Sequence, residues 1–452
     1  MPNTHTRIDA LEDKKMMNPL HRLSLAAAAA ALLLPQQAGA EPLSPVEEKI
    51  VAAVKARSPE ALKLLERSVN VNSGTMNFEG VREVGRIFGA EFEQLGFAVR
   101  WSGMPPAMQR AGHLVATHAG TQGKRVLLIG HLDTVFEKTS AVQLWNRQGE
   151  RVRGQGVNDM KGGDVIIIEA LRALKAAGVL DPARITVVFS GDEERAGDPI
   201  EVSRADMVKA AKDSDVALAF EGTVRDKSGL DTATIGRRAS ASWSIKISGK
   251  QGHSAGVFSE SSGYGAIYEA ARILNTFREQ LIEPDLTFNA AMVLGGTELS
   301  FDNLQQTGTI SGKTNIIPKV ALVKGDMRYL SVEQRDKALA KMRAIVAQSL
   351  PGTHAEFSFN ESYPPMAPTA GNLAVLALYS KASADAGLGA IPALPAGQRG
   401  AGDVQFVAPY VDSLDGLGAA GNGAHSPEED LELASIERAA IRTAVLLYRL
   451  TR

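Results

Sequence analysis

Apolar stretches that read as strands alternate with helical stretches between about residues 113 and 222. The strand-like runs are HLVATHA, KRVLLIGHLDTV, RITVVFSGDEE and DVALAFEG, and the helical run DVIIIEALRALKAAG lies among them. This alternation indicates a layered α/β sheet with helices on its faces. Because open α/β sheets gather their ligands at the carboxyl ends of the strands, we expect the catalytic groups there.

A different pattern occupies the stretch from about residue 237. The runs SASWSIKISG, GYGAIYEAARILNTFREQL, LTFNAAMVLGG, ALVKGDMRYL, VEQRDKALAKMRAIVAQSL and AEFSFN read as strand, helix, strand, strand, helix and strand. That order is typical of a ferredoxin-like unit. We therefore predict an α/β catalytic domain in two parts, 41–236 and 364–452, with a ferredoxin-like α+β domain inserted at 237–363.

The N-terminus has the pattern of a secretory signal. The apolar run LSLAAAAAALLL at 23–34 follows basic residues and precedes the small-residue run AGA. We predict that residues 1–40 are a signal peptide cleaved before Glu41, which places the mature protein in the periplasm or outside the cell. The alternatives are an apolar N-terminal helix or a misassigned start codon; the tandem Met16 and Met17 indicate a start there. No later apolar run of about 20 residues predicts a membrane span.

Composition restricts the chemistry. The chain contains no Cys, so any metal must be held by His, Asp and Glu, and any nucleophile is a hydroxyl or an activated water. Its 49 Lys and Arg residues are scattered, and the formal net charge is -2. Nucleic-acid binding needs clustered cations, so we expect a small neutral or acidic partner instead.

Acidic and His residues directly follow the apolar runs. Neutral imidazoles and carboxylates suit zinc, and two ions about 3.5–4 Å apart can share one bridging carboxylate. Singly these signals are weak, because a His after a strand is usually structural and adjacent acids often begin a helix. Their occurrence together favours a metal site made of His131, Asp133, Asp159, Glu193, Glu194, Glu221 and His425.

These residues resemble those of the dinuclear zinc peptidases and deacylases, a family that includes glutamate carboxypeptidase, succinyl-diaminopimelate desuccinylase, acetylornithine deacetylase and aminoacylase. The resemblance runs in order through GHLDTV, GVNDMKGG, GDEE, FEG, GKQGHSAG, TNIIP, GDMRY and GAHSPEE. It implies two zinc ions per chain, with Asp159 bridging them. His131 and Glu221 would complete the ligands of one ion, and Glu194 and His425 those of the other.

The resemblance also implies catalytic roles. Glu193 would be the general base, which takes a proton from the attacking water and gives it to the leaving nitrogen. Asp133 would accept the imidazole N–H of His131 and fix its tautomer. Glu221, rather than Asp, is similar to the branch with glutamate carboxypeptidase, the desuccinylase and aminoacylase, and this favours a substrate with a free carboxylate near the scissile amide.

The inserted domain would act as a lid and a dimerisation domain in the family. Arg328 and Asn315 match positions that hold the substrate's α-carboxylate, and Arg suits this role because its planar fork pairs with a carboxylate. His253 matches a histidine that helps to stabilise the oxyanion, often from the neighbouring subunit, which implies a homodimer. The alternatives are a surface ion pair for Arg328 and a structural loop role for His253.

The loop GQRGAGD at 397–403 fits no phosphate-binding pattern. The resemblance places it beside the substrate, with Gly400 as a backbone contact. The loop departs from the commoner Gly-Gly-Thr-Asp form, and Arg399 is an added cation. The remaining candidates His113, His118 and His354 match nothing in the family and are assigned structural roles.

Three functions are compatible with these features. The first is an exported metallocarboxypeptidase that releases a C-terminal amino acid, plausibly glutamate, from a small peptide or N-acyl substrate. The second is an N-acyl amino-acid deacylase or desuccinylase with the same zinc chemistry. The third is a non-catalytic binding protein on the same scaffold, which the intact ligand set and Glu193 disfavour.

Overall fold

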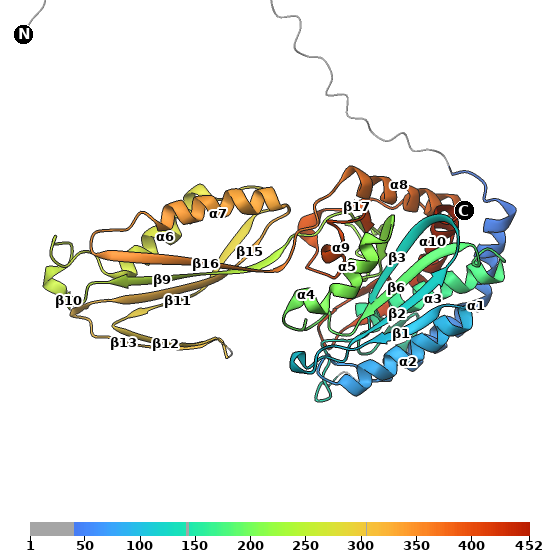
Figure 1. Ribbon diagram of the computed structural model, residues 1–452, viewed down its shortest axis with the longest axis horizontal. Helices are drawn as coiled ribbons and strands as arrows, with labels where there is room; N and C mark the ends of the chain where they lie inside the picture. Colours follow the sequence, from blue (N-terminus) through green and yellow to red (C-terminus); the bar gives the residue numbers. More distant parts are fainter. Residues whose placement is uncertain (1–39, 142–143, 304) are drawn as a thin grey trace, which may run out of the picture. The chain divides into compact units, whose positions relative to one another are not determined.

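A computed structural model describes residues 40–141, 144–303 and 305–452 of the chain (Figure 1). Residues Ala40–Arg452 form one compact unit. The predicted signal peptide lies outside the described residues except for Ala40. No helix among the described residues is both long and apolar enough to cross a membrane.

The predicted α/β sheet is confirmed as a six-stranded sheet in the order β1-β2-β6-β3-β7-β18. The strands β6, β3, β7 and β18 are parallel to one another, whereas β1 and β2 are antiparallel additions at one edge. Since the parallel strands end at the same edge, the residues that follow them converge. The strands are β1 (Ala98–Ser102), β2 (His113–Ala119), β3 (Gln122–His131), β6 (Ala183–Ser190), β7 (Val216–Ala219) and β18 (Ser413–Leu414).

Both faces of this sheet are covered by helices, because its central strands are apolar on both sides. Along β3, Val126 and Leu128 join the larger hydrophobic core, whereas Leu127 and Ile129 join a smaller core on the opposite face. The larger core contains α1 (Pro45–Val69), α2 (Phe78–Leu95), α3 (Gly162–Ala176), α8 (Ala370–Asp385) and α10 (Leu433–Leu450). The smaller core contains α5 (Ala205–Lys212) and α9 (Val404–Val407), and α4 (Ile200–Ser203) precedes α5.

The inserted segment has the predicted ferredoxin-like order. Its antiparallel sheet runs β11-β15-β9-β16, and α6 and α7 cover one face of it (Figure 1). A separate hydrophobic core that includes Trp243, Phe277 and Met342 lies between these helices and the sheet. The domain boundaries at 236/237 and 363/364 stay predictions. The elements are β9 (Ser240–Gly249), α6 (Ala266–Gln280), β11 (Thr287–Gly296), β15 (Val320–Arg328), α7 (Val332–Val346) and β16 (Thr353–Tyr363).

Smaller elements complete the structure. The insert carries a hairpin and a two-stranded ribbon: β12 (Glu298–Asp302) with β13 (Thr307–Ser311), and β10 (Gly252–His253) with β14 (Ile316–Ile317). A four-stranded sheet, β19-β20-β5-β4, supports the loop that carries His425. Its strands are β4 (Asn146–Gln148), β5 (Arg151–Arg153), β19 (Gly421–Asn422) and β20 (Asp430–Glu432), and β8 (Ala233–Thr234) pairs with β17 (Ala393–Leu394). Single helical turns occur at η1 (Pro106–Met108), η2 (Val157–Lys161), η3 (Ser254–Gly256) and η4 (Ala396–Gln398).

Candidate metal centre

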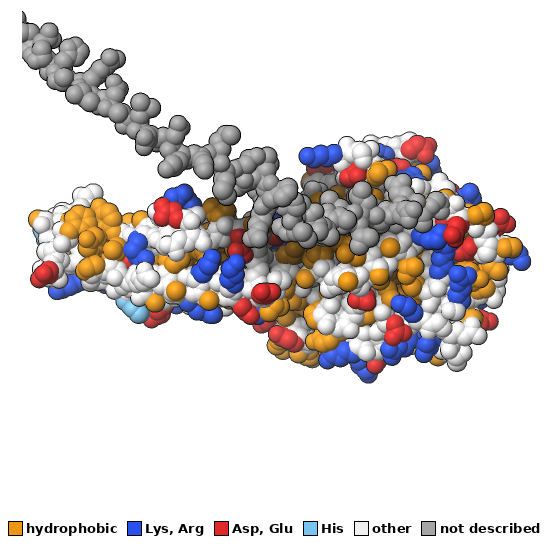
Figure 2. Space-filling view, turned by 90° about the horizontal axis from the view of Figure 1, so that it is seen from above, with side chains coloured by type: hydrophobic (Ala, Val, Ile, Leu, Met, Phe, Trp, Pro, Cys, Tyr) orange, Lys and Arg blue, Asp and Glu red, His pale blue; other side chains and the backbone are white. Residues whose placement is uncertain are grey.

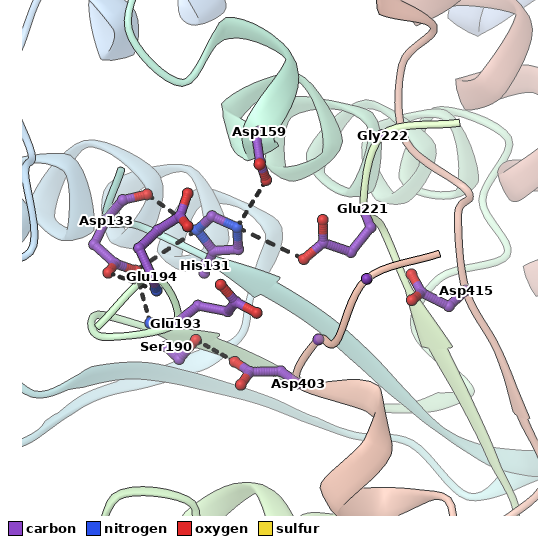
Figure 3. Close-up of polar contacts among 12 residues, drawn as sticks. His131, Asp133, Asp159, Ser190, Glu193, Glu194, Glu221, Gly222, Asp403 and Asp415 are labelled. Carbon is purple, nitrogen blue, oxygen red and sulfur yellow. Dashed lines mark hydrogen bonds and ion pairs between the residues drawn. The ribbon is translucent and has the colours of Figure 1, made fainter. Parts of the chain in front are cut away.

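The polar residues that follow the parallel strands meet at one edge of the central sheet (Figure 3). His131 is the last residue of β3, Glu193 and Glu194 follow the end of β6 at Ser190, and Glu221 follows the end of β7 at Ala219. The convergence of parallel strand ends therefore accounts for these four residues of the cluster, as the sequence pattern predicts.

His131 presents one ring nitrogen to two carboxylates. Its Nε2 lies 3.3 Å from Asp159 Oδ1 and 3.6 Å from Glu221 Oε1, and its side chain is buried. Its Nδ1 donates a hydrogen bond of 3.0 Å to the main-chain carbonyl of Asp133. A proton held on Nδ1 leaves the lone pair of Nε2 directed at the two carboxylates, as a metal ligand requires.

His425 also presents one ring nitrogen to two carboxylates, and it contacts the other oxygen of Asp159. Its Nε2 lies 3.1 Å from Asp159 Oδ2 and 3.0 Å from Glu194 Oε2. The φ of His425 is 65°, a left-handed conformation that residues other than glycine seldom adopt and that occurs often at functional sites. The two oxygens of Asp159 thus face two different imidazoles, which is the arrangement of a bridging carboxylate.

The donor atoms fit two metal ions. In each of the two triads, His131–Asp159–Glu221 and Asp159–Glu194–His425, one ligand atom per residue lies within 4.8 Å of the others. The second oxygen of Glu194, Oε1, is buried without a hydrogen-bond partner among the described residues. Oxygen and nitrogen donors crowded in this way suit a divalent cation. A third possible triad, His131–Glu193–Glu194, shares His131 with the first triad and Glu194 with the second.

The shifted pKa values of the cluster also indicate an excess of negative charge that cations would balance. Burial, followed by the charge of Asp159, raises the pKa of Glu221 to about 7. Burial also raises the pKa of Glu193 well above its usual value; His131 opposes this, and the carboxylates of Glu221, Asp403 and Glu194 add to it. Hydrogen bonds to Asp159 and Glu194 raise the pKa of His425 to about 11. Divalent cations would relieve this repulsion and replace the proton on the imidazole.

Asp133 acts differently from the sequence-based expectation. The main-chain carbonyl of Asp133, and not its carboxylate, accepts the imidazole N–H of His131; the nearest carboxylate oxygen is 3.6 Å from Nδ1. The carboxylate instead accepts the main-chain N–H groups of Glu193 (3.0 Å) and Glu194 (3.1 Å), and the hydroxyl of Thr75 (2.6 Å). Asp133 therefore orients both the histidine and the turn that carries the two glutamates.

Glu429 is a positioning residue that the sequence-based analysis missed. One of its oxygens, Oε1, accepts the main-chain N–H groups of Asn158 (2.8 Å) and Asp159 (3.0 Å), and its side chain is fully buried. Burial and then the charge of Asp159 raise the pKa of Glu429 to about 8. Its position in the motif GAHSPEE, four residues after His425, was the available signal, but nothing in the spacing distinguishes it from the exposed Glu428.

A buried arginine, Arg204, supports the Glu193 turn from behind. Its Nε donates to Asp403 Oδ1 (2.7 Å) and its Nη1 to Asp192 Oδ1 (2.6 Å). Asp192 directly precedes Glu193, and the hydroxyl of Tyr363 donates to the carbonyl of Glu193 at 3.1 Å. This arginine could not be found from the sequence, because it lies outside every motif and meets Asp403 only in the folded chain.

The loop that contains Gly400 is held by the buried Arg237. This arginine pairs with the buried Asp415 (Nε to Oδ2, 2.6 Å) and donates Nη1 to the carbonyls of Gly400 (2.8 Å) and Ala401 (2.9 Å). The carbonyl of Gly400 is therefore already occupied, and a Cβ at Gly400 would contact nothing within 4 Å. The proposed backbone contact of Gly400 with substrate stays a prediction.

The three substrate-binding candidates on the insert lie outside the cluster. His253 and Asn315 are brought together on the β10–β14 ribbon, where the N–H of Ser254 donates to the carbonyl of Asn315 at 2.9 Å. Both are exposed. Arg328 ends β15 and lies 3.3 Å from Asp326. Within the described part of the chain, no hydrogen bond or ion pair joins these three residues to the metal ligands, so their roles stay predictions.

The remaining histidines have structural contacts. His113 is buried between the carbonyl of Ser203 and the N–H of Gly191, and His118 lies 2.8 Å from the carbonyl of Ala183. His354 is exposed beside Glu356. None of the three belongs to a candidate metal triad.

Comparison with known proteins identifies the family. Residues 127–449 match the model of Peptidase family M20/M25/M40. The chain belongs to this family. It is 30% identical over 335 residues to carboxypeptidase G2 of Pseudomonas sp. (strain RS-16), and the aligned region covers 74% of each protein. It is 27% identical over 265 residues to the succinyl-diaminopimelate desuccinylase of Novosphingobium aromaticivorans, which covers 57% of this chain and 66% of that protein.

A solved structure supports the fold of this M20 peptidase. The Bacillus subtilis YxeP protein, described as a dinuclear metal-binding peptidase of the M20 family, superposes with a TM-score of 0.60 at 16% identity and covers 88% of this chain and 99% of that chain. The family assignment makes this protein a hydrolase, and its residues include two candidate metal-binding triads.

Proposed function

We propose that this M20 peptidase is an exported dinuclear zinc carboxypeptidase that releases a C-terminal amino acid, plausibly glutamate, from a small peptide or N-acyl substrate. The observation that carries the proposal is the position of Asp159 between two imidazoles, with each of its oxygens within 3.3 Å of one of them. The 30% identity to carboxypeptidase G2 supports the carboxypeptidase reaction.

The residues of this chain would have separate roles in the reaction. Two zinc ions, when bound by His131, Asp159, Glu194, Glu221 and His425, would polarise the scissile carbonyl and lower the pKa of the attacking water. Glu193 takes a proton from that water as its oxygen adds to the carbonyl carbon. Glu193 then delivers the proton to the amide nitrogen as the C–N bond breaks. The carboxylate of Asp133 keeps Glu193 in place by accepting the main-chain N–H of Glu193.

A raised pKa suits Glu193 for this task. General bases work best when their pKa lies near the working pH, and burial together with nearby carboxylates moves the pKa of Glu193 upward from its usual value. Ligation of the neighbouring carboxylates to cations would moderate the shift. Glu193 would then accept a proton from water and release it to nitrogen within one cycle.

Arg328 and Asn315 are proposed to bind the α-carboxylate of the substrate, and His253 of a neighbouring subunit to stabilise the oxyanion in a homodimer formed through the insert. The insert would act as a lid over the metal centre. The apolar run at 23–34 and the following AGA support export to the periplasm or the medium. An exported enzyme of this kind suits the recovery of amino acids from peptides.

A second candidate is an N-acyl amino-acid deacylase or desuccinylase. The likeness to succinyl-diaminopimelate desuccinylases favours it, because the same metal ligands serve an amide bond to any acyl group. The proposed export argues against it, since biosynthetic intermediates stay in the cytoplasm.

A substrate panel on purified, zinc-loaded protein tests the proposal. The panel compares peptides with C-terminal glutamate, N-acyl amino acids and N-succinyl amino acids. We expect release of C-terminal glutamate with the highest kcat/KM. Cleavage of N-acyl or N-succinyl substrates alone, with no peptide hydrolysis, would replace the carboxypeptidase by the deacylase.

A further inference from the structure

The guanidinium of Arg399 is the cation at the metal centre that the proposed function leaves unused. Its Nη1 donates to the carbonyl of Gly222 at 3.0 Å, directly beside the metal ligand Glu221. Its Nε is buried with no hydrogen-bond partner, and Arg399 forms no ion pair within the described part of the chain. A guanidinium with a buried, unpaired N–H and no carboxylate partner is costly, and two metal ions nearby would increase the cost.

The loop around Arg399 is rigid. Arg237 clamps the next two carbonyls, those of Gly400 and Ala401, and is itself fixed by Asp415. On the far side, the buried Gln405 accepts the N–H of Gly402 at 2.8 Å. Four buried or short-range contacts thus hold a surface loop in one conformation. A side chain on such a loop is positioned before any ligand arrives.

A cavity of about 330 Å³ lies next to Arg399 and the metal ligands Asp159 and Glu221. Two other arginines line it, but carboxylates already neutralise both: Arg151 pairs with Asp430, and Arg225 with Asp231 and Glu432. The unneutralised charge in the wall is that of Arg399. On the face seen in Figure 2, Lys and Arg side chains are mixed with Asp and Glu side chains.

We propose that Arg399 binds a second carboxylate of the substrate in this cavity, separate from the α-carboxylate assigned to Arg328. The inference rests on the proposed function and narrows it: the preferred substrates are dicarboxylates. The second carboxylate comes either from the side chain of the released residue, as in glutamate, or from the acyl group, as in a succinyl amide. Arg suits both, because its planar fork makes parallel hydrogen bonds to a carboxylate.

Paired substrates that differ by one charge test the proposal. One pair has C-terminal glutamate or glutamine, and the other has an N-succinyl group or its carboxamide counterpart. For the wild type we expect the carboxylate in one pair to be favoured in kcat/KM on the order of ten- to a hundredfold, as for hydrogen bonds to charged groups. The pair that shows the preference identifies the source of the carboxylate.

Three variants assign the preference to a residue. Arg399→Gln should bring the ratio of kcat/KM between the two substrates of the pair close to one. Arg399→Lys should keep part of the preference for the carboxylate. Arg151→Gln is the matched control, since it removes a neutralised cation from the same cavity and should keep the wild-type ratio. A ratio unchanged by Arg399→Gln, or an equal loss on both members of a pair, would overturn the proposal.

A binding measurement separates this inference from the proposed function. Glu193→Gln protein loaded with zinc is titrated by calorimetry with N-acetyl-glutamate and N-acetyl-glutamine, and with N-succinyl-alanine and its carboxamide counterpart. Because each pair shares the α-carboxylate, direct binding to zinc cancels in the ratio of Kd values. If the wild type cleaves no amide, the proposed function fails. The anion site is still supported if Glu193→Gln prefers the carboxylate ligand of a pair and the double variant Glu193→Gln/Arg399→Gln has lost that preference. A Kd ratio near one in both proteins overturns it.

Discussion

Replacing Glu429 by Ala should loosen the metal centre although Glu429 is not itself a proposed metal ligand. The substitution leaves the main-chain N–H groups of Asn158 and Asp159 without their acceptor in a buried environment. Each buried donor left unsatisfied costs about 1–3 kcal/mol, so two cost about 2–6 kcal/mol. Water that enters the space left by the side chain recovers part of this, and we expect a loss of about 2–4 kcal/mol in unfolding free energy.

The same change should weaken metal binding. Asp159 bridges the two triads, and its backbone is held by Glu429, so removal of that acceptor frees the carboxylate to leave its bridging position. Partners one step behind a metal ligand typically change metal affinity by roughly 10–100-fold. Glu429→Gln keeps an oxygen acceptor at the same place. Because the pKa of Glu429 is raised to about 8, the wild-type side chain is largely neutral near pH 7, and Gln is a close substitute.

Urea unfolding in the presence of a chelator measures the first effect, and zinc titration against a competing chelator measures the second. Glu428→Ala is the matched control, because Glu428 is the neighbouring residue and is exposed. We expect wild type, Glu428→Ala and Glu429→Gln to have similar free energies of unfolding and similar zinc affinities. Both quantities should be much lower for Glu429→Ala. If Glu429→Ala bound zinc as tightly as Glu428→Ala, the argument that Glu429 positions Asp159 would be refuted.

Substitutions elsewhere in the chain test four other assignments. Glu193→Gln should abolish turnover while the zinc content measured by elemental analysis stays near two per chain; Glu83→Gln, on the exposed face of α2, is its control, and loss of zinc in Glu193→Gln would show a ligand instead of a base. Arg204→Met should cost about 3–5 kcal/mol in urea unfolding, because it leaves Asp192 and Asp403 buried without their partner; an unchanged midpoint would contradict the buried network. Arg328→Ala should lower kcat/KM mainly for substrates with a free α-carboxylate, and an equal loss on their methyl esters would count against its assigned role. The hydrogen bond to Arg125 lowers the pKa of Asp215 to about 2, so its stabilising effect is present above the unfolded pKa near 3.8 and is lost as the pH falls towards 2; the gap in unfolding midpoint between wild type and Asp215→Asn should therefore shrink from pH 6 to pH 2.5, and a gap that widened would reverse the sign.

Part of the candidate metal site could be predicted from the sequence because several of its residues follow strands, whereas the assignment of individual ligands rests on the family resemblance. His131 ends an apolar strand, and Glu193, Glu194 and Glu221 follow two more strands of the same parallel sheet. Once the strands are recognised, their ends must converge. The ferredoxin-like insert could be predicted for a related reason, since its order of strands and helices is local information.

The supporting residues could not be predicted, because their roles depend on contacts between distant segments. Arg204 joins Asp192 to Asp403, which are more than two hundred residues apart, and Arg237 joins Asp415 to the 400–401 carbonyls. Neither arginine stands in a motif. For Asp133 even the correct residue was assigned the wrong atom: a two-residue spacing places it beside His131, but only the folded backbone decides that its carbonyl accepts the imidazole proton while its carboxylate holds the glutamate turn.

Arg399 shows how such supporting contacts can define specificity. In the sequence it is one cation in a glycine-rich loop and gives no hint of its environment. In the fold, Arg237 pairs with Asp415 and the cavity-lining Arg151 pairs with Asp430, whereas Arg399 donates only to the carbonyl of Gly222. The networks that fix the loop therefore also isolate one positive charge beside the metal ligands. A substrate anion is the partner that would complete it, so the selectivity of this peptidase is expected to depend on Arg399, the arginine in the wall of this cavity that forms no ion pair with the described residues.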